Sequence, residues 1–100
     1  MKFTLELYDS DVPIEFENLD VGIFFYDEKY NIVDTSFKVR SKSKLKDIMT
    51  VYNDLFILDD RGGTNARLIR EGGAGIKGRI YIYPVDDYSA KIHLNFEGES

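Results

Sequence analysis

The sequence predicts an α+β fold, in which a mostly antiparallel sheet of five or six strands carries one main amphipathic helix. Two observations lead to this prediction: apolar and polar residues alternate near both ends of the chain, and one central stretch has helical spacing instead. One helix on one antiparallel sheet is an economical way to bury the apolar face of that helix. The chain has 100 residues, the length of one domain. We therefore expect residues 1–100 to form a single domain with the order β-β-β-α-β-β-β.

The start of the chain predicts one clear strand and one weak one. In residues 2–8, KFTLELY, every second side chain is apolar, which predicts a half-buried strand. Residues 9–20 are rich in turn formers, and Pro13 argues against a central strand. We expect only a short edge segment there, at Ile14 and Phe16.

The other predicted strands form a hairpin and a three-strand meander. Residues 21–27, VGIFFYD, are apolar on both faces, which predicts a central strand that pairs with residues 32–39. Near the end of the chain, glycine-rich and aspartate-rich turns separate residues 66–71, 76–84 and 90–96. Each of these segments is expected to be a strand.

One helix is predicted between the two groups of strands. Ser41 or Ser43 is expected to cap its start, because a hydroxyl can accept a hydrogen bond from an otherwise unpaired backbone N–H. Gly62 or Gly63 is expected at its end, where a left-handed residue often follows a helix. The apolar residues with helical spacing are Leu45, Ile48, Met49, Tyr52, Leu55 and Phe56.

A row of cations precedes and enters this predicted helix. Residues 38–46, KVRSKSKLK, carry Lys or Arg at every second position, and an extended strand would place all five on one face. If the helix begins within this segment, the row is broken up. We favour an exposed strand end followed by a helix start, with an anion-contacting surface as the alternative.

Composition narrows the class of protein. The net charge of −5 is opposite to the usual basic footprint of a nucleic-acid-binding domain, so we do not expect general DNA binding. The absence of cysteine excludes disulfides and thiolate metal sites, and fits a reducing compartment. The chain does not begin with the apolar run of a signal peptide, and no stretch is apolar over the length that spans a membrane. We therefore expect a cytoplasmic protein.

The most ligand-like stretch is the arginine- and glycine-rich region of residues 61–79. Glycine turns expose backbone N–H groups to anions, and arginine forks match phosphate or carboxylate groups. A formal G-x-G-x-x-G match lies between two predicted strands, where the dinucleotide fingerprint does not occur, so a simple hairpin turn is the alternative. Tyr81 and Tyr83 share a strand face with Arg79, and the helix is expected either to cover this face or to leave it as a contact surface. The predicted anion contacts are Arg61, Arg67, Arg70, Lys77, Arg79, Tyr81 and Tyr83.

The first 28 residues are strongly acidic. They contain eight acidic residues against Lys2 alone, a net charge of −7. Such a region attracts a partner with a basic surface and raises the rate of association with it. The predicted partner contacts are Asp9, Asp11, Glu15, Glu17 and Asp20.

No catalytic constellation is visible in the sequence. His93 is the only histidine, which together with the absence of cysteine argues against a usual zinc site, and we expect no metal or other cofactor. We predict a small non-catalytic protein-interaction module, such as an inhibitor, an immunity protein or a phage-encoded antagonist. The alternatives are a sensor or sequestering domain for an anionic small molecule such as a nucleotide, and a small enzyme that uses His93. Pairing of two copies through a strand edge is also open.

Overall fold

The computed structural model describes residues 2–58 and 63–96. In these residues four strands precede one helix and three strands follow it, which confirms the predicted α+β class with one strand more than expected. All strand pairings are antiparallel. The elements are β1 (Lys2–Asp9), β2 (Val12–Val21), β3 (Phe25–Asp27), β4 (Ile32–Lys38), α1 (Lys42–Leu58), β5 (Thr64–Arg70), β6 (Gly75–Pro84) and β7 (Ser89–Asn95).

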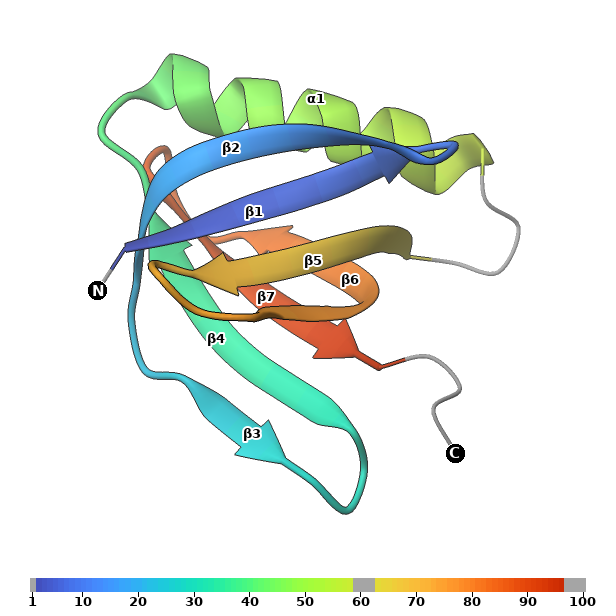
Figure 1. Cartoon of the computed structure of the whole chain (residues 1–100). Helices are drawn as coiled ribbons and strands as arrows, with labels where there is room; N and C mark the ends of the chain where they lie inside the picture. Colours follow the sequence, from blue (N-terminus) through green and yellow to red (C-terminus); the bar gives the residue numbers. More distant parts are fainter. Residues whose placement is uncertain (1, 59–62, 97–100) are drawn as a thin grey trace.

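The sheet bends round and closes on itself (Figure 1). Its strand order is β2-β1-β5-β6-β7-β4-β3, and the end of β2 also pairs with the end of β4. Asp20 opposes Lys38 and Val21 opposes Phe37 in this short ladder. Six strands therefore form a ring, while β3 is attached to the outside edge of β4 and pairs with no other strand of the described chain.

The inner face of the ring is the core of the protein. The registers align apolar residues of neighbouring strands, such as Leu5 with Leu68 and Ile80 with Leu94, so that all of them point inward. Full burial of one such side chain contributes about 1.5–3 kcal/mol before the conformational entropy is subtracted. The large apolar side chains with almost no exposed surface are Leu5, Leu7, Leu19, Val33, Phe37, Ile48, Leu68, Ile80, Ile92 and Leu94.

The helix α1 covers one part of this inner face (Figure 1). Leu45, Ile48 and Tyr52 are buried, as the helical spacing predicts. The backbone N–H of Lys44 donates to Ser41 Oγ over 3.2 Å, which confirms the predicted cap at Ser41. Gly62, one of the two residues predicted to end the helix, lies outside the described residues. Within the described chain, α1 is not long and apolar enough to cross a membrane.

Two predictions about the first third of the chain are wrong. Residues 12–21 form the complete strand β2 instead of a short edge segment, because Pro13 lies close to its start. Asn18 has φ of 63° where the register with β1 shifts, which marks a bulge and lets the strand continue round the ring. Residues 21–27 are not a central strand, because β2 ends at Val21 and Phe25–Asp27 forms an edge strand.

Candidate functional site

One broad depression lies on the outer face of the sheet, beside β3. We call it the outer groove, and its volume is about 690 Å³. Its wall comes from Ile23 and Phe25, which are 89% and 55% exposed, and from Tyr83, which is 55% exposed. Large apolar side chains that are at least half exposed are unusual when they lie together. The described residues that line the outer groove are Ile23, Phe25, Asp34, Thr35, Ser36, Tyr83, Lys91, Ile92 and His93.

A histidine–aspartate pair lies in this groove. His93 Nδ1 and Asp34 Oδ1 are 2.7 Å apart, across paired positions of β7 and β4. A carboxylate on Nδ1 orients an imidazole and leaves Nε2 for proton transfer. Among the residues that the structure describes, His93 makes no hydrogen bond to a hydroxyl group, so the nucleophile of a triad is not in place. Catalysis by His93 stays a prediction.

A second depression lies at an end of the sheet interior. We call it the mouth pocket, and its volume is about 360 Å³. All of its described lining residues come from β1, β2, β5, β6 and the loops beside them, and Arg70 is the only charged one. The Phe24 ring stacks on Phe3 with their centroids 6.2 Å apart. The residues that line the mouth pocket are Phe3, Val21, Gly22, Phe24, Leu68, Arg70, Ala74 and Ile76.

The segment that leads into β3 therefore lines both depressions, with alternate side chains. Ile23 and Phe25 belong to the outer groove, whereas Phe24 belongs to the mouth pocket. Tyr26, on the same side as Phe24, meets Phe96 edge to face at 5.5 Å. This arrangement explains why residues 21–27 are apolar at nearly every position without being a central strand.

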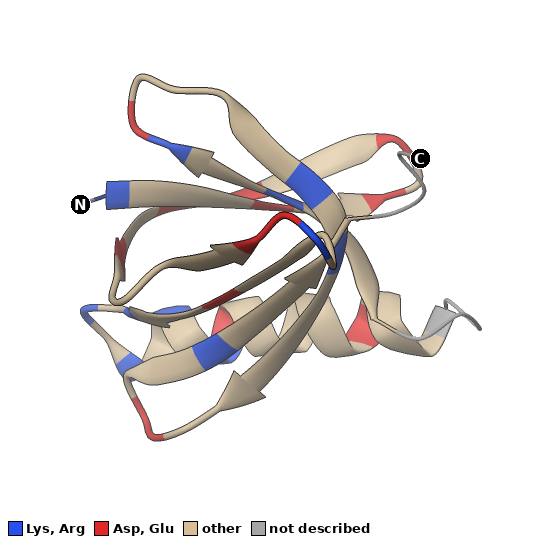
Figure 2. Ribbon diagram, turned by 90° about the horizontal axis from the view of Figure 1, so that it is seen from below, with Lys and Arg blue, Asp and Glu red and all other residues tan. Residues whose placement is uncertain are grey.

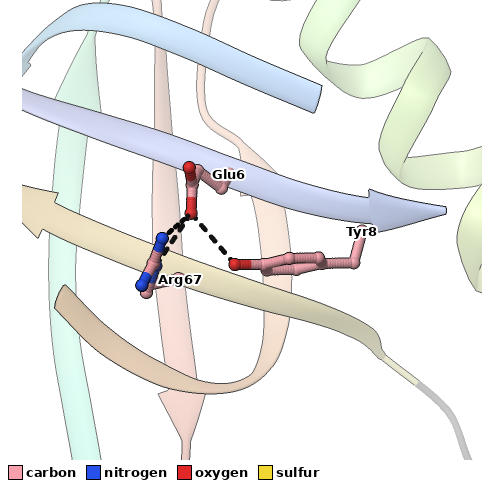
Figure 3. Close-up of polar contacts among 3 residues, drawn as sticks. All are labelled: Glu6, Tyr8 and Arg67. Carbon is pink, nitrogen blue, oxygen red and sulfur yellow. Dashed lines mark hydrogen bonds and ion pairs between the residues drawn. The ribbon is translucent and has the colours of Figure 1, made fainter. Parts of the chain in front are cut away.

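Two of the predicted anion contacts already have partners inside the protein. Arg67 lies on the outer face and holds Glu6, with both Nε and a terminal nitrogen 2.8 Å from Oε1 (Figure 3). Tyr8 donates its hydroxyl to the same oxygen over 3.0 Å. Arg79 is buried and donates to the carbonyl oxygen of Gly63 and to Asn65 Oδ1, each over 3.2 Å. Their main contacts are therefore structural.

All three residues of this cluster, Glu6, Tyr8 and Arg67, have shifted pKa values, and that of the Arg67 guanidinium is raised by its hydrogen bond to Glu6. The hydrogen bond from Arg67 lowers the pKa of the Glu6 carboxyl below its ordinary value of 4.5. Removal from water raises the pKa of the Tyr8 hydroxyl, and its hydrogen bond to the Glu6 carboxylate raises that pKa further. The cluster therefore favours an ionised Glu6 and a protonated Tyr8 at neutral pH.

The remaining predicted anion contacts do not form one cluster. Arg70 has the strand parity of Leu68, so it lies on the inner side at the mouth pocket, whereas Lys77 is exposed on β6 opposite Arg67. Tyr81 and Tyr83 share the outer face, because Ile80 and Ile82 point into the core that α1 helps to cover. Arg61 lies outside the described residues. Arg67 and Arg70 lie on opposite faces of β5 because strand side chains alternate. This alternation is the sequence signal that could have separated them.

The predicted acidic contacts lie along β2 and the turn before it. Glu15, Glu17 and Asp20 are exposed on β2, and Asp9 and Asp11 are exposed at the β1–β2 turn. Figure 2 shows that acidic and basic segments are interspersed over the described part of the sheet. Contact of these acids with a partner stays a prediction.

The basic segment of residues 38–46 is split as the favoured interpretation predicts. Lys38 ends β4, and Lys42 begins α1. Lys42 Nζ is 3.3 Å from Asp87 Oδ2, and Lys44 Nζ donates to the carbonyl oxygen of Glu17. These cations lie against β2 and the β6–β7 turn, which weakens the case for a phosphate-tracking row.

Neither a metal centre nor a known relative indicates the function. Among residues 2–58 and 63–96, no group of three or more His, Asp or Glu side chains is arranged to hold a metal ion. No protein-family model matches the chain, and comparisons with curated proteins and with solved structures give no match. What the protein does must therefore be inferred from its described surface, which includes the outer groove and the mouth pocket.

Proposed function

We propose that this protein is a small non-catalytic interaction module that binds another protein through β3 and the outer groove. The observation that carries the proposal is the exposure of Ile23 and Phe25 beside Tyr83 on one side of the sheet. Large apolar side chains at the centre of an interface lose contact with water on binding and supply most of its affinity. A partner would cover this patch with its own apolar side chains.

The free edge of β3 supports binding of an extended segment. Because β3 pairs only with β4 in the described chain, the backbone groups on its other edge have no strand partner. Such an edge accepts an added strand, and alternate side chains of that strand then lie against the faces of the sheet. Soluble proteins usually protect edges with Lys or Pro, and Phe25–Asp27 has neither.

The charge of the neighbouring chain indicates a basic partner. Residues 9–28 contain seven acids and no Lys or Arg, whereas in the outer groove itself Asp34 is balanced by Lys91. Complementary charge steers a partner towards its site and speeds association at low salt. We therefore propose a partner segment with apolar residues flanked by Lys or Arg, acting in the cytoplasm, with which the cysteine-free sequence is compatible.

The test compares two double variants of the purified protein. Ile23→Ser/Phe25→Ser removes two side chains of the patch, and Val12→Ser/Val85→Ser removes two that are 65% and 58% exposed elsewhere. Proteins retained from source cells are identified, purified and titrated against each variant. We expect the first variant to weaken binding about tenfold or more and the second to bind as the wild type does.

Three results would contradict the proposal. Binding that tolerates Ile23→Ser/Phe25→Ser, or that is lost equally in both variants, would place the interface elsewhere. Self-association that the first variant abolishes would identify a second copy as the occupant in place of a basic partner. Association at low salt that is unchanged by Glu15→Lys/Glu17→Lys/Asp20→Lys would remove the electrostatic part of the argument.

A further inference from the structure

We propose a second and separate function beyond protein binding: the mouth pocket binds a small amphipathic anion, an apolar chain or ring that ends in a carboxylate. The pocket and the outer groove share no described lining residue. The proposal depends on the apolar wall of the pocket, on the position of Arg70 and on the volume. None of these depends on a partner protein.

The wall of the pocket suits an apolar group. Phe3, Val21 and Leu68 reach it from the inner faces of three strands, and Phe24 and Ile76 complete it. Binding sites for small molecules are typically apolar hollows in which few polar groups fix the orientation of the ligand. An apolar group here would be bound by the same removal from water that stabilises the core.

Arg70 supplies one positive charge at this pocket. It ends β5 with the parity of Leu68, and its side chain lies against Gly73 in the turn that follows. Within residues 2–58 and 63–96, its guanidinium forms no ion pair or hydrogen bond, whereas Arg67 and Arg79 are both engaged. A guanidinium binds one carboxylate through two parallel hydrogen bonds. The pocket therefore places a guanidinium that could pair with a carboxylate beside an apolar hollow.

The surroundings of Arg70 limit the charge of the ligand. A shallower depression next to the mouth pocket is also lined by Arg70 and Phe3, and it adds Lys2, Glu17 and Glu71. The two carboxylates there offset the charge of the two cations. Because these charges cancel, only direct pairing with Arg70 favours a carboxylate at the pocket. The several negative charges of a nucleotide triphosphate would have no further cation to offset them.

The volume limits the size of the apolar part. About 360 Å³ corresponds to roughly a dozen groups of the size of a water molecule. Decanoate, with about this number of non-hydrogen atoms, is a suitable probe, and decanol is its uncharged counterpart. Longer chains would project past Phe24, a lining residue that is 41% exposed.

The experiment titrates decanoate into the full chain and follows backbone amide signals by NMR together with the heat of binding. Arg70→Gln removes the charge, and Lys77→Gln is the matched control, because Lys77 is an exposed cation that does not line the pocket. Ala74→Trp fills the pocket from an exposed turn position. Thermal unfolding of each variant establishes that it is folded.

We expect decanoate to shift the amides of Phe3, Gly22 and Leu68 with a saturable curve. Arg70→Gln should weaken binding about tenfold or more, Ala74→Trp should abolish it, and Lys77→Gln should leave it unchanged. Decanol should bind more weakly than decanoate. The proposal is overturned if the shifts are absent or centre on the outer groove, if Arg70→Gln binds as Lys77→Gln does, or if decanol binds as tightly as decanoate.

Discussion

Arg67 binds a single carboxylate oxygen of Glu6 through two of its nitrogens, each at 2.8 Å, on the outside of the closed sheet. The two residues are direct cross-strand partners on β5 and β1. Glu6 is only 3% exposed although it lies on the outer face, because Arg67 and Tyr8 cover it. Arg67, which the sequence suggests as an anion contact, therefore pairs with Glu6 and joins β5 to β1.

Replacing Glu6 should destabilise the protein. Glu6→Gln removes the charge that Arg67 binds and weakens the hydrogen bonds from Arg67 and Tyr8. We expect the free energy of unfolding to fall by about 1–2 kcal/mol, measured by urea denaturation. Glu17→Gln is the control, because that carboxylate is exposed and its contact with Lys44 uses only the backbone oxygen. Equal losses in the two variants would show that the cluster is not specifically stabilising.

The cost of Glu6→Gln should depend on pH. The pKa of Glu6 is lowered from 4.5 in the folded protein, so the ion pair stabilises the fold fully above that ordinary value. Its contribution is lost as the pH falls through the lowered pKa of the folded state. The difference in unfolding free energy between wild type and Glu6→Gln should therefore narrow below pH 4.5. A difference that stays constant from neutral to acidic pH would contradict the assignment.

Arg79 should prove structural, although the sequence presents it as an anion contact. Its guanidinium satisfies the carbonyl oxygen of Gly63 and the side chain of Asn65 in a buried position. Arg79→Met should lower the free energy of unfolding by about 1–3 kcal/mol, because these acceptors lose their donor. Lys77→Met, on the same strand but exposed, should be close to neutral in the same thermal or urea melt. If Arg79→Met left the free energy of unfolding unchanged, Arg79 would again be a candidate ligand contact.

Gly78 should tolerate no side chain, because β6 and β7 approach closely there. A Cβ at this position would lie 2.4 Å from the carbonyl oxygen of Asn95, which is backbone and cannot swing aside. Gly78→Ala should therefore cost about 1–3 kcal/mol. At Gly73 a Cβ would meet the flexible side chain of Arg70 at 3.1 Å, so Gly73→Ala should cost less, within about 0.5 kcal/mol. Equal stability of the two variants by urea denaturation would refute this explanation.

The strands and the helix could be predicted from the sequence because their signals are local. Alternation in residues 76–84 and 90–96 marks β6 and β7 to within one residue, and Leu45, Ile48 and Tyr52 are buried as predicted. The closure of the ring could not be predicted. It depends on two residue pairs between β2 and β4, and no local pattern distinguishes Val21 opposite Phe37 from any other apolar pair.

The candidate site is harder to predict, because residues that are close in the sequence can lie on opposite faces of a strand. Arg67, Arg70 and Lys77 are close in the chain, but strand alternation places only Arg70 on the side of Leu68. Applied to β5, the alternation rule would have separated them. The apolar run of residues 21–27 is ambiguous for a physical reason, since a segment that lines two opposite depressions has the same composition as a buried strand.

The two sides of the segment before β3 should respond differently to substitution. Ile23→Ser removes a side chain that is 89% exposed, so it should change the free energy of unfolding by no more than about 0.5 kcal/mol. Phe24→Ser removes a ring that stacks on Phe3 and covers the mouth pocket, so it should cost about 1 kcal/mol or more. Both are measured by thermal and urea unfolding of the purified protein. A large loss from Ile23→Ser would mean that Ile23 stabilises the folded chain, and would remove the reason for regarding it as a surface kept for a partner.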